Sequence, residues 1–326
     1  MYSKKFACMV FVVHWLCSIT ISAVPMPSGP LRSHITGGFK AIQTRSSRSD
    51  LDCSQFTSDY DILYHFPFFI MVNPINSDWS KSTATTNEAG TLVVNLRLLN
   101  ELSVPLSIFC LKNLRSLYIS STPFPNNIVP DDLKNLKQLV EFQIYNSPVK
   151  NMTEQLGSLT NLNRLYLQSC SLTRLPDLSG LYRLQGVYLD NNHLHEVIGL
   201  DSVTDLGLSN NLFTQIPTLA NPGDLRLLIM DRNPLKNMLA ITSHTNIYYL
   251  NLQNSNLTSV PATIDKLQNL QYLYLSDNKL FYLPTNILKL TKLQFIYIQN
   301  NLFSTSDLQT IKNQFNKTLP SVKLYS

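Results

Sequence analysis

One pattern of apolar and polar positions recurs along most of this 326-residue chain. In "LYLSDNKLFYLP", residues 273–284, Leu273 and Leu275 are followed by Asn278, Leu280 and Leu283. The same spacing appears in "LNLQNSNLTSVP" (250–261), "LGLSNNLFTQIP" (206–217) and "LYLQSCSLTRLP" (165–176). Because the apolar positions persist while the polar letters change, the chain is predicted to be a tandem repeat.

Alignment on the pattern L-x-x-L-x-L-x-x-N-x-L gives ten copies, whose first positions lie 19 to 25 residues apart. Chance does not keep such a register over two hundred residues. The 25- and 19-residue intervals predict an irregular loop after Ile119 and a shortened unit at 184–203. The copies begin at Val93, Leu114, Leu139, Leu162, Leu184, Val203, Leu225, Ile247, Leu270 and Leu293.

The first, fourth and sixth places of each copy predict one short strand. Side chains alternate along a strand, so the fourth and sixth places share a face and enter the core. A unit of this length buries its leucines only against the units before and after it, which predicts a stacked solenoid.

The ninth place is expected to satisfy buried backbone groups in the turn, because an inward amide both donates and accepts hydrogen bonds. Cys170 holds this place in one copy and is therefore expected to be a small buried residue rather than a nucleophile. The asparagines at this place are Asn192, Asn211, Asn233, Asn278 and Asn301.

On these residues the chain resembles extracellular leucine-rich repeat proteins over residues 91–303. "LYLSDNKLFYLPTNILKLTKL" is close to the 23-residue type of repeat. The resemblance implies an α/β leucine-rich repeat solenoid, an arc or horseshoe with a parallel β-sheet on its concave face. The family serves in receptor ectodomains, as inhibitors of secreted enzymes and in adhesion.

Both ends of such a stack need covering. Residues 49–90 resemble the N-terminal cap of plant-type receptors, in which a helical segment and a Trp, here Trp79, precede the first repeat. The paired cysteines of those caps are missing around this Trp. Residues 304–326 are predicted to form a C-terminal cap, with a helix capped at Ser304 to Ser306 and "SVKLY" as a last edge strand.

The start of the chain is predicted to be a secretory signal peptide, residues 1–23, with Lys4 and Lys5 before an apolar run and small residues near Ala23. The alternative is a signal anchor that stays in the membrane. Residues 24–48 have no apolar period and are predicted to be disordered. A cleaved product is expected to be secreted, without stable membrane insertion.

Three sequons agree with a secretory route and predict glycosylation at Asn151, Asn256 and Asn316. Cleavage would leave Cys53, Cys110 and Cys170, an odd number, so at least one thiol is free or pairs between molecules. The one intramolecular pair considered is Cys53 with Cys110, which would tie the N-terminal segment to the first repeat.

The third, fifth and seventh places of each strand point away from the core. Five of the ten fifth places are Tyr. This pattern predicts a binding face, because Tyr combines a large rigid contact area with a hydroxyl. The alternative is that Tyr is simply a favourable strand residue. The candidate ligand-binding residues are Tyr118, Tyr166, Tyr188, Tyr249, Tyr272, Tyr274, Phe295 and Tyr297.

No pattern in the chain indicates an enzyme. His193 and His195 flank the inward Leu194 and fall on a solvated turn, so a metal site there is not expected. Cys53 with His65 lacks an orienting group for a nucleophile. Asp59 with Asp61 is more typical of helix capping than of acid–base catalysis, and no cofactor is implied.

The net charge of the chain argues against one class of ligand, nucleic acids. The formal net charge of +5 falls to about +3 without the two lysines of the signal peptide, too weak and scattered for nucleic-acid binding. The sequence therefore favours a secreted protein that binds a protein or peptide ligand through a concave, Tyr-rich face. An inhibitor of a secreted hydrolase and a structural or adhesion protein of the matrix stay open as alternatives, and so does the oligomeric state.

Overall fold

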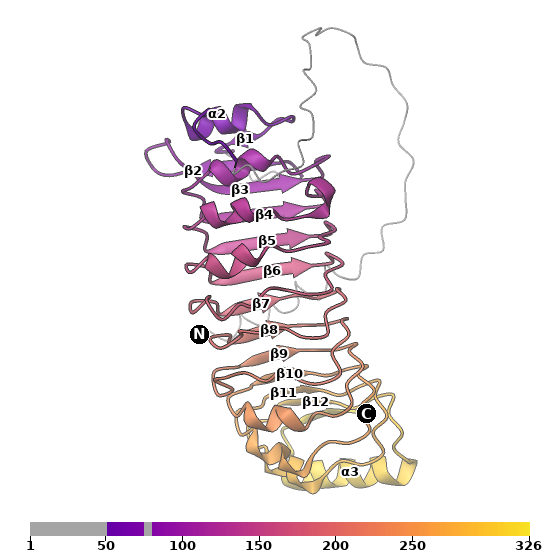
Figure 1. The fold of residues 1–326 in the computed structure, drawn as a ribbon. Coiled ribbons are helices and arrows are strands. Elements are labelled where there is room, and N and C mark those ends of the chain that lie inside the picture. Colours follow the sequence, from indigo (N-terminus) through magenta and orange to yellow (C-terminus); the bar gives the residue numbers. More distant parts are fainter. Residues whose placement is uncertain (1–50, 75–79) are drawn as a thin grey trace. The chain divides into compact units, whose positions relative to one another are not determined.

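The computed structural model describes residues 51–74 and 80–326. The predicted signal peptide (1–23), the segment 24–48 and Trp79 lie outside these residues. In the described part, thirteen strands form one sheet whose order follows the chain from β1 to β13 (Figure 1). Nearly all neighbouring pairs are parallel, as stacked repeats require.

Each of the ten predicted copies contributes one strand. Neighbouring strands pair place for place, so that Tyr249 lies opposite Tyr272 and Leu250 opposite Leu273. The strands are β3 (Val93–Leu99), β4 (Ser116–Ser120), β5 (Glu141–Tyr145), β6 (Arg164–Gln168), β7 (Gly186–Tyr188), β8 (Asp205–Gly207), β9 (Leu227–Ile229), β10 (Tyr249–Asn251), β11 (Tyr272–Tyr274) and β12 (Phe295–Tyr297).

The interior of the stack is a continuous apolar core. Leu250, Leu252, Leu273 and Leu275, at the fourth and sixth places of two copies, are completely buried. The chain returns on the other side of each coil, in several copies through one turn of 3₁₀-helix: η1 (Leu106–Cys110), η2 (Pro125–Asn127), η3 (Asp131–Asn135), η4 (Glu154–Ser158), η5 (Leu239–Ser243), η6 (Ala262–Lys266) and η7 (Thr285–Lys289).

The two irregular intervals have separate physical causes. The long copy after β4 makes room for η2 and for a bridge between Ile128 and Asn151. The short copy after β7 brings its backbone close to the preceding coil. Gly199 adopts φ +81°, and a Cβ there would lie 2.0 Å from the nitrogen of Ser179, so only glycine fits.

The ninth-place asparagines bridge successive coils. The Nδ2 of Asn278 donates to the carbonyls of Leu252 (2.8 Å) and Leu275 (3.0 Å), while its Oδ1 accepts from the amides of Ser255 and Leu257 (both 3.0 Å). The other four ninth-place asparagines make the same contacts. Each donates from Nδ2 to a backbone carbonyl of its own coil and to one of the preceding coil, and each accepts at Oδ1 from a backbone amide of the preceding coil. They are Asn192, Asn211, Asn233 and Asn301.

The N-terminal end departs from a purely parallel sheet. Helix α2 (Asp59–Tyr64), capped by Ser58, precedes β1 (Met71–Val72) and β2 (Thr83–Thr86), and β2 runs antiparallel to β3. Asn87 closes the reversal by accepting from the amides of Thr91 and Leu92. A connection this short permits only antiparallel pairing, because parallel strands need a crossover.

The C-terminal end carries helix α3 (Thr305–Thr318) and strand β13 (Lys323–Tyr325), which pairs with β12. The side chain of Ser304 accepts from the amide of Asp307 in a capping box. Ile311 and Phe315 are buried against the last coils, so the helix packs on the core through one face.

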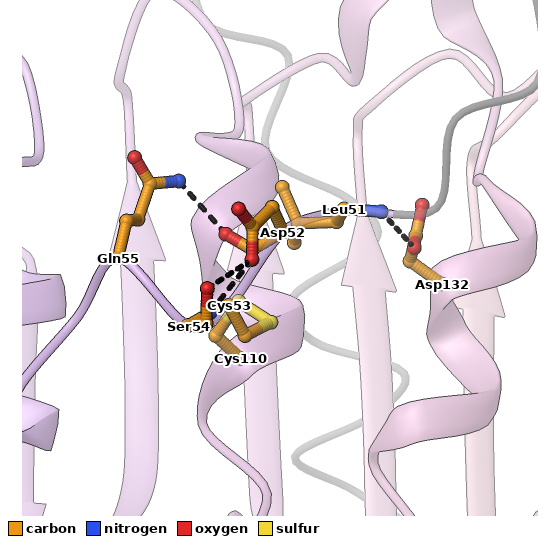
Figure 2. Close-up of a disulfide and its surroundings, with 7 residues drawn as sticks. All are labelled: Leu51, Asp52, Cys53, Ser54, Gln55, Cys110 and Asp132. Carbon is orange, nitrogen blue, oxygen red and sulfur yellow. Dashed lines mark hydrogen bonds between the residues drawn. A yellow bond between two sulfur atoms is a disulfide. The ribbon is translucent and has the colours of Figure 1, made fainter.

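A disulfide joins Cys53 to Cys110 at the end of η1 (Figure 2). It ties the segment before α2 to the first repeat across a separation of 57 residues. Beside it, the Asp52 carboxylate accepts from the amide and hydroxyl of Ser54, and the Leu51 amide donates to Asp132 at 3.1 Å. The N-terminal segment is therefore held both covalently and by hydrogen bonds.

Replacing Cys53 by Ser should destabilise the protein by about 4 kcal/mol, the chain-entropy value for a loop of this length. Urea unfolding of the oxidised wild type and the variant measures the difference. The matched control is reduction of wild type, which should lower stability to the same level. An unchanged unfolding midpoint would show that the disulfide does not form in the protein.

Replacing Asn278 by Ala should cost about 2–4 kcal/mol, because two buried amides lose their acceptor. Asn313→Ala, on the exposed side of α3, is the control and should change stability by less than about 0.5 kcal/mol. Equal urea midpoints for the two variants would contradict a bridging role for the ninth place.

Candidate ligand-binding face

The face of the sheet that points away from the core, called the outer face below, carries the third, fifth and seventh places of β3–β12 together with Lys323 and Tyr325 of β13. The fifth-place tyrosines are half-buried here, because each ring packs against neighbouring rings. They are Tyr118, Tyr166, Tyr188, Tyr274 and Tyr297.

Four tyrosines on β4–β7 form what is called the N-terminal row below: Tyr118, Tyr145, Tyr166 and Tyr188. Their ring centroids are 5.3, 6.3 and 4.9 Å apart in that order, and the last two rings are parallel within 6°. The guanidinium of Arg97 lies over the first ring at 4.6 Å. The row is thus a continuous series of ring contacts, two tilted and one stacked, that begins on a cation.

Six rings on β10–β13 form a second group, called the C-terminal cluster. Tyr249, Tyr272 and Phe295 make one row at the third place, with centroids 5.8 and 5.3 Å apart. Tyr274, Tyr297 and Tyr325 make a parallel row at the fifth place, with centroids 4.5 and 4.4 Å apart. Tyr249 also meets Tyr274 at 5.2 Å, which joins the two rows.

The fifth places of β8–β10 carry no aromatic residue and separate the two groups of rings. Gly207, Ile229 and Asn251 occupy the fifth places there, and all three are buried although they point outward. A Cβ at Gly207 would lie only 2.8 Å from the ring of Tyr188, which shows that this ring leans over the glycine. These three residues are therefore buried by side chains of neighbouring strands on the outer face and not by the core.

Hydrogen-bonded polar groups fill the interruption. Asp190 accepts from the side-chain amide of Gln168 and the backbone amide of Ser209. Asp231 accepts from the hydroxyl of Ser209 and the side-chain Nδ2 of Asn251. Burial raises the pKa of Asp190, and its hydrogen bonds oppose that shift. The outer face therefore has two aromatic regions separated by an acidic, internally bonded strip.

On the outer face, the hydroxyls of Tyr145, Tyr188, Tyr249 and Tyr297 stay protonated at neutral pH. Burial raises the pKa of Tyr145, Tyr188 and Tyr249 well above the usual value, and raises that of Tyr297 to about 12. A protonated hydroxyl is both a donor and an acceptor. The rings thus present neutral hydrogen-bonding groups beside apolar edges.

The three sequon asparagines, Asn151, Asn256 and Asn316, are exposed. None belongs to the outer face. Asn151 lies in the bridge to Ile128, Asn256 in a turn with φ 60°, and Asn316 on α3. A glycan on any of them would project from other sides of the coils.

The weaker chemical candidates do not come together. His193 and His195 are exposed on either side of buried Leu194. The imidazole of His195 lies 3.8 Å from the carboxylate of Glu196. Within residues 51–74 and 80–326, no three His, Cys, Asp or Glu side chains gather in metal-binding geometry. Cys170 is buried in the core, and burial raises the pKa of its thiol to about 12.

Three residues of the outer face are additional to the predicted binding set. Tyr145 belongs to the N-terminal row from a seventh place, and Tyr325 extends the C-terminal cluster from β13. Lys323 lies over the ring of Phe295 at 5.4 Å. Extending the repeat alignment into "SVKLY" would have revealed the latter two, because they occupy its third and fifth places.

Comparison with known proteins supports the repeat architecture. A family model described as leucine rich repeat matches residues 245–303. The probable serine/threonine-protein kinase roco9 of Dictyostelium discoideum is 30% identical over 88 residues. That match covers 25% of this chain and only 3% of the kinase, so it reflects a shared repeat and not a shared whole protein.

Solved structures extend the likeness. The ectodomain of the Arabidopsis thaliana receptor kinase GASSHO1/SCHENGEN3, in complex with CASPARIAN STRIP INTEGRITY FACTOR 2, has a TM-score of 0.57 and 26% identity over 69% of this chain and 29% of its own. The plant peptide hormone receptor RGFR1, in complex with RGF2, has a TM-score of 0.51 and 25% identity over 64% of this chain and 36% of its own.

A bacterial protein shares the fold at lower identity. An internalin from Listeria monocytogenes, inlF, has a TM-score of 0.55 and 19% identity over 69% of this chain and 70% of its own. The fold is therefore a leucine-rich repeat solenoid with a parallel sheet. Among the described residues, no helix is both long and apolar enough to cross a membrane.

Four outer-face tyrosines whose pKa is raised by burial, Tyr145, Tyr188, Tyr249 and Tyr297, should make stability fall at high pH. The folded protein holds the pKa of these tyrosines above the unfolded value of about 10. Their contribution to the free energy of unfolding is therefore complete below about pH 10 and is lost as pH rises through about 12. Urea midpoints measured over this range, together with the ultraviolet absorbance of tyrosinate, follow both events. Tyrosines that all ionise near pH 10 in the native protein would contradict the stacked geometry.

Proposed function

We propose that this leucine-rich repeat protein binds a protein or peptide ligand on its outer face, with the C-terminal cluster as the main contact. The observation that carries the proposal is the arrangement of six half-buried or exposed rings on four adjacent strands. Tyrosine is enriched where binding energy concentrates, and large aromatic patches on a protein surface mark interaction sites.

The rigidity of the cluster favours binding. Each ring is fixed between its neighbours at 4.4 to 5.8 Å, and the strands beneath are held by ladder hydrogen bonds. A rigid side chain has little rotamer freedom left to lose when a ligand arrives. Binding to this rigid surface therefore loses less conformational entropy than binding to a flexible surface would.

Two structural neighbours support the class of ligand. Both the GASSHO1/SCHENGEN3 ectodomain and RGFR1 were solved with a peptide or protein factor bound, and both are at least 25% identical to this chain. This chain spans only about a third of the length of either receptor. We therefore infer only the class of ligand, a peptide or small protein, from these two neighbours.

We also propose that the protein is secreted and glycosylated. The disulfide between Cys53 and Cys110 suits an oxidising compartment. The sequon asparagines are exposed, and glycans there would leave the outer face free. The predicted signal peptide lies outside the described residues, so a mass spectrum of the protein released by expressing cells is the measurement that tests cleavage and glycosylation together.

The alternative role of the tyrosines is purely structural, because stacked rings also stabilise neighbouring strands. The two roles differ in what substitution changes. Loss of stacking lowers the free energy of unfolding, whereas loss of a binding surface lowers affinity in a protein that is still folded at the assay temperature.

Replacing Tyr272, Tyr274 and Tyr297 by Ala should weaken ligand binding by at least about tenfold, because these three rings form the centre of the cluster. The full chain is immobilised and panned against a random library of linear peptides, and affinities of the enriched peptides are measured for both proteins. Circular dichroism and a thermal melt show that the variant remains folded.

Tyr282→Ala is the matched control, since this exposed tyrosine lies outside the outer face. It should leave affinity unchanged. The proposal fails if the folded triple variant binds the enriched peptides as tightly as the wild type does.

A further inference from the structure

The hydroxyl groups of the C-terminal cluster form a series of their own beside the ring contacts. The hydroxyl of Tyr249 is hydrogen-bonded to that of Tyr274, which is also hydrogen-bonded to that of Tyr297. The series continues from Tyr297 to Tyr325, and Tyr325 is 38% exposed. Four phenols are therefore linked, hydroxyl to hydroxyl, from the half-buried rings of β10 and β11 to the accessible strand β13.

A series of this kind can move a hydrogen atom. A phenol that loses an electron and a proton becomes a phenoxyl radical, and a hydrogen-bonded phenol beside it can give its own hydrogen atom to the radical oxygen. This exchange needs protonated hydroxyls, and burial raises the pKa of Tyr297 to about 12. The ring centroids along the series are 4.4 to 5.2 Å apart, so each radical has its next partner in contact.

Tyr249 and Tyr274 meet in a different way from the other members of the series. Tyr249 lies opposite Tyr272, and Tyr274 lies opposite Asn251, so the two tyrosines are diagonal neighbours on β10 and β11. The Cβ atoms of diagonal neighbours in a sheet lie roughly 7–8 Å apart. The two ring centroids are nevertheless 5.2 Å apart, at an interplanar angle of 38°. The side chains therefore converge at their hydroxyl ends.

Oxidative coupling of two tyrosines requires this convergence. The new bond joins the carbon ortho to one hydroxyl with the same carbon of the other ring, so the hydroxyl ends must meet while the Cβ atoms stay apart. Tyr297 lies directly opposite both Tyr274 and Tyr325, with rings parallel within 5° and 2°. Coupling within either of these stacked pairs would push paired strands apart, because their Cβ atoms are as close as their rings.

The N-terminal row offers an internal comparison. Tyr118 and Tyr145 have a similar separation and tilt, with ring centroids 5.3 Å apart and an interplanar angle of 34°. The hydroxyl of Tyr145, however, donates to the side-chain oxygen of Gln143 at 3.3 Å. This phenol is directed to an amide on its own strand, which cannot give a hydrogen atom to a phenoxyl radical as a second phenol can.

We propose that the C-terminal cluster is an oxidative cross-linking site, at which a peroxidase and hydrogen peroxide join Tyr249 to Tyr274 by a carbon–carbon bond. The oxidant removes an electron and a proton from the accessible Tyr325, and hydrogen-atom exchange along the hydroxyl series moves the radical to the pair. The cross-link ties β10 to β11 on the outer face. This inference does not depend on the ligand proposed above.

The reaction consumes one hydrogen peroxide for each cross-link. Two oxidation events leave one radical on Tyr249 and one on Tyr274, and the new bond pairs the two unpaired electrons at the ortho carbons. Each of these carbons then releases its ring hydrogen as a proton and each oxygen takes one up, which restores two aromatic phenols. In total, two electrons and two protons leave the pair, and the peroxide that accepts them becomes two molecules of water.

Tandem mass spectrometry tests the proposal on the full-length chain after treatment with a peroxidase and hydrogen peroxide. The monomer fraction is digested, and we expect two peptides joined through Tyr249 and Tyr274, lighter than their sum by two hydrogen atoms. Dityrosine fluorescence should appear in the same fraction. Tyr274→Phe should abolish the joined peptides. Tyr282→Phe, which removes an exposed phenol outside the outer face, should leave their yield unchanged.

Tyr297→Phe tests the hydroxyl series in a protein that keeps its stacked rings. It should lose most of the joined peptides, whereas circular dichroism should stay as in the wild type. Tyr145→Phe removes one hydroxyl from the N-terminal row and is the matched control, with an unchanged yield expected.

Three results would overturn the proposal. The first is a monomer without the bond between Tyr249 and Tyr274. The second is a yield that Tyr297→Phe does not lower, which would show that the radical does not travel along the hydroxyl series. The third is cross-linking confined to exposed tyrosines such as Tyr60 and Tyr64, which would show that accessibility alone selects the site.

Discussion

Each coil of this protein is too small to enclose a core of its own. Its leucines become buried only when the coils before and after it are in place, and the turn that follows the strand carries backbone amides into the same dry interior. Asn278 shows how the second requirement is met, since one side chain serves two amides of the preceding coil and a carbonyl of each coil. Burial and backbone satisfaction are thus shared between neighbours.

The same requirement builds the outer face. If the fourth and sixth places must enter the core, the third, fifth and seventh must leave it, and place-for-place pairing brings equal places side by side. A tyrosine at one place in successive copies therefore becomes a stack with the spacing of the strands. The rings of Tyr274, Tyr297 and Tyr325 lie 4.5 and 4.4 Å apart because β11, β12 and β13 do not allow them to separate.

The strands and the inward asparagines could be predicted because they depend on one local rule repeated ten times. The burial of Gly207, Ile229 and Asn251 could not, since it arises from side chains of adjacent coils that lean sideways across the outer face. Nor could the antiparallel β2, which lies outside the repeat and takes its direction from the tight turn at Asn87. Sequence reasoning succeeded where the period holds and at the C-terminal cap, where Ser304 and the last strand have local signals of their own. It failed where side chains of adjacent coils meet across the outer face.

The aromatic clusters also show that stability and recognition need not compete for the same atoms. In the C-terminal cluster, stacking uses the ring faces, which hold neighbouring strands together, and leaves edges and hydroxyls for a ligand. A ligand that required the faces would have to unstack the rings and lose that stabilisation. The strand spacing thus fixes the stack, and with it the positions of the ring edges that a ligand can reach.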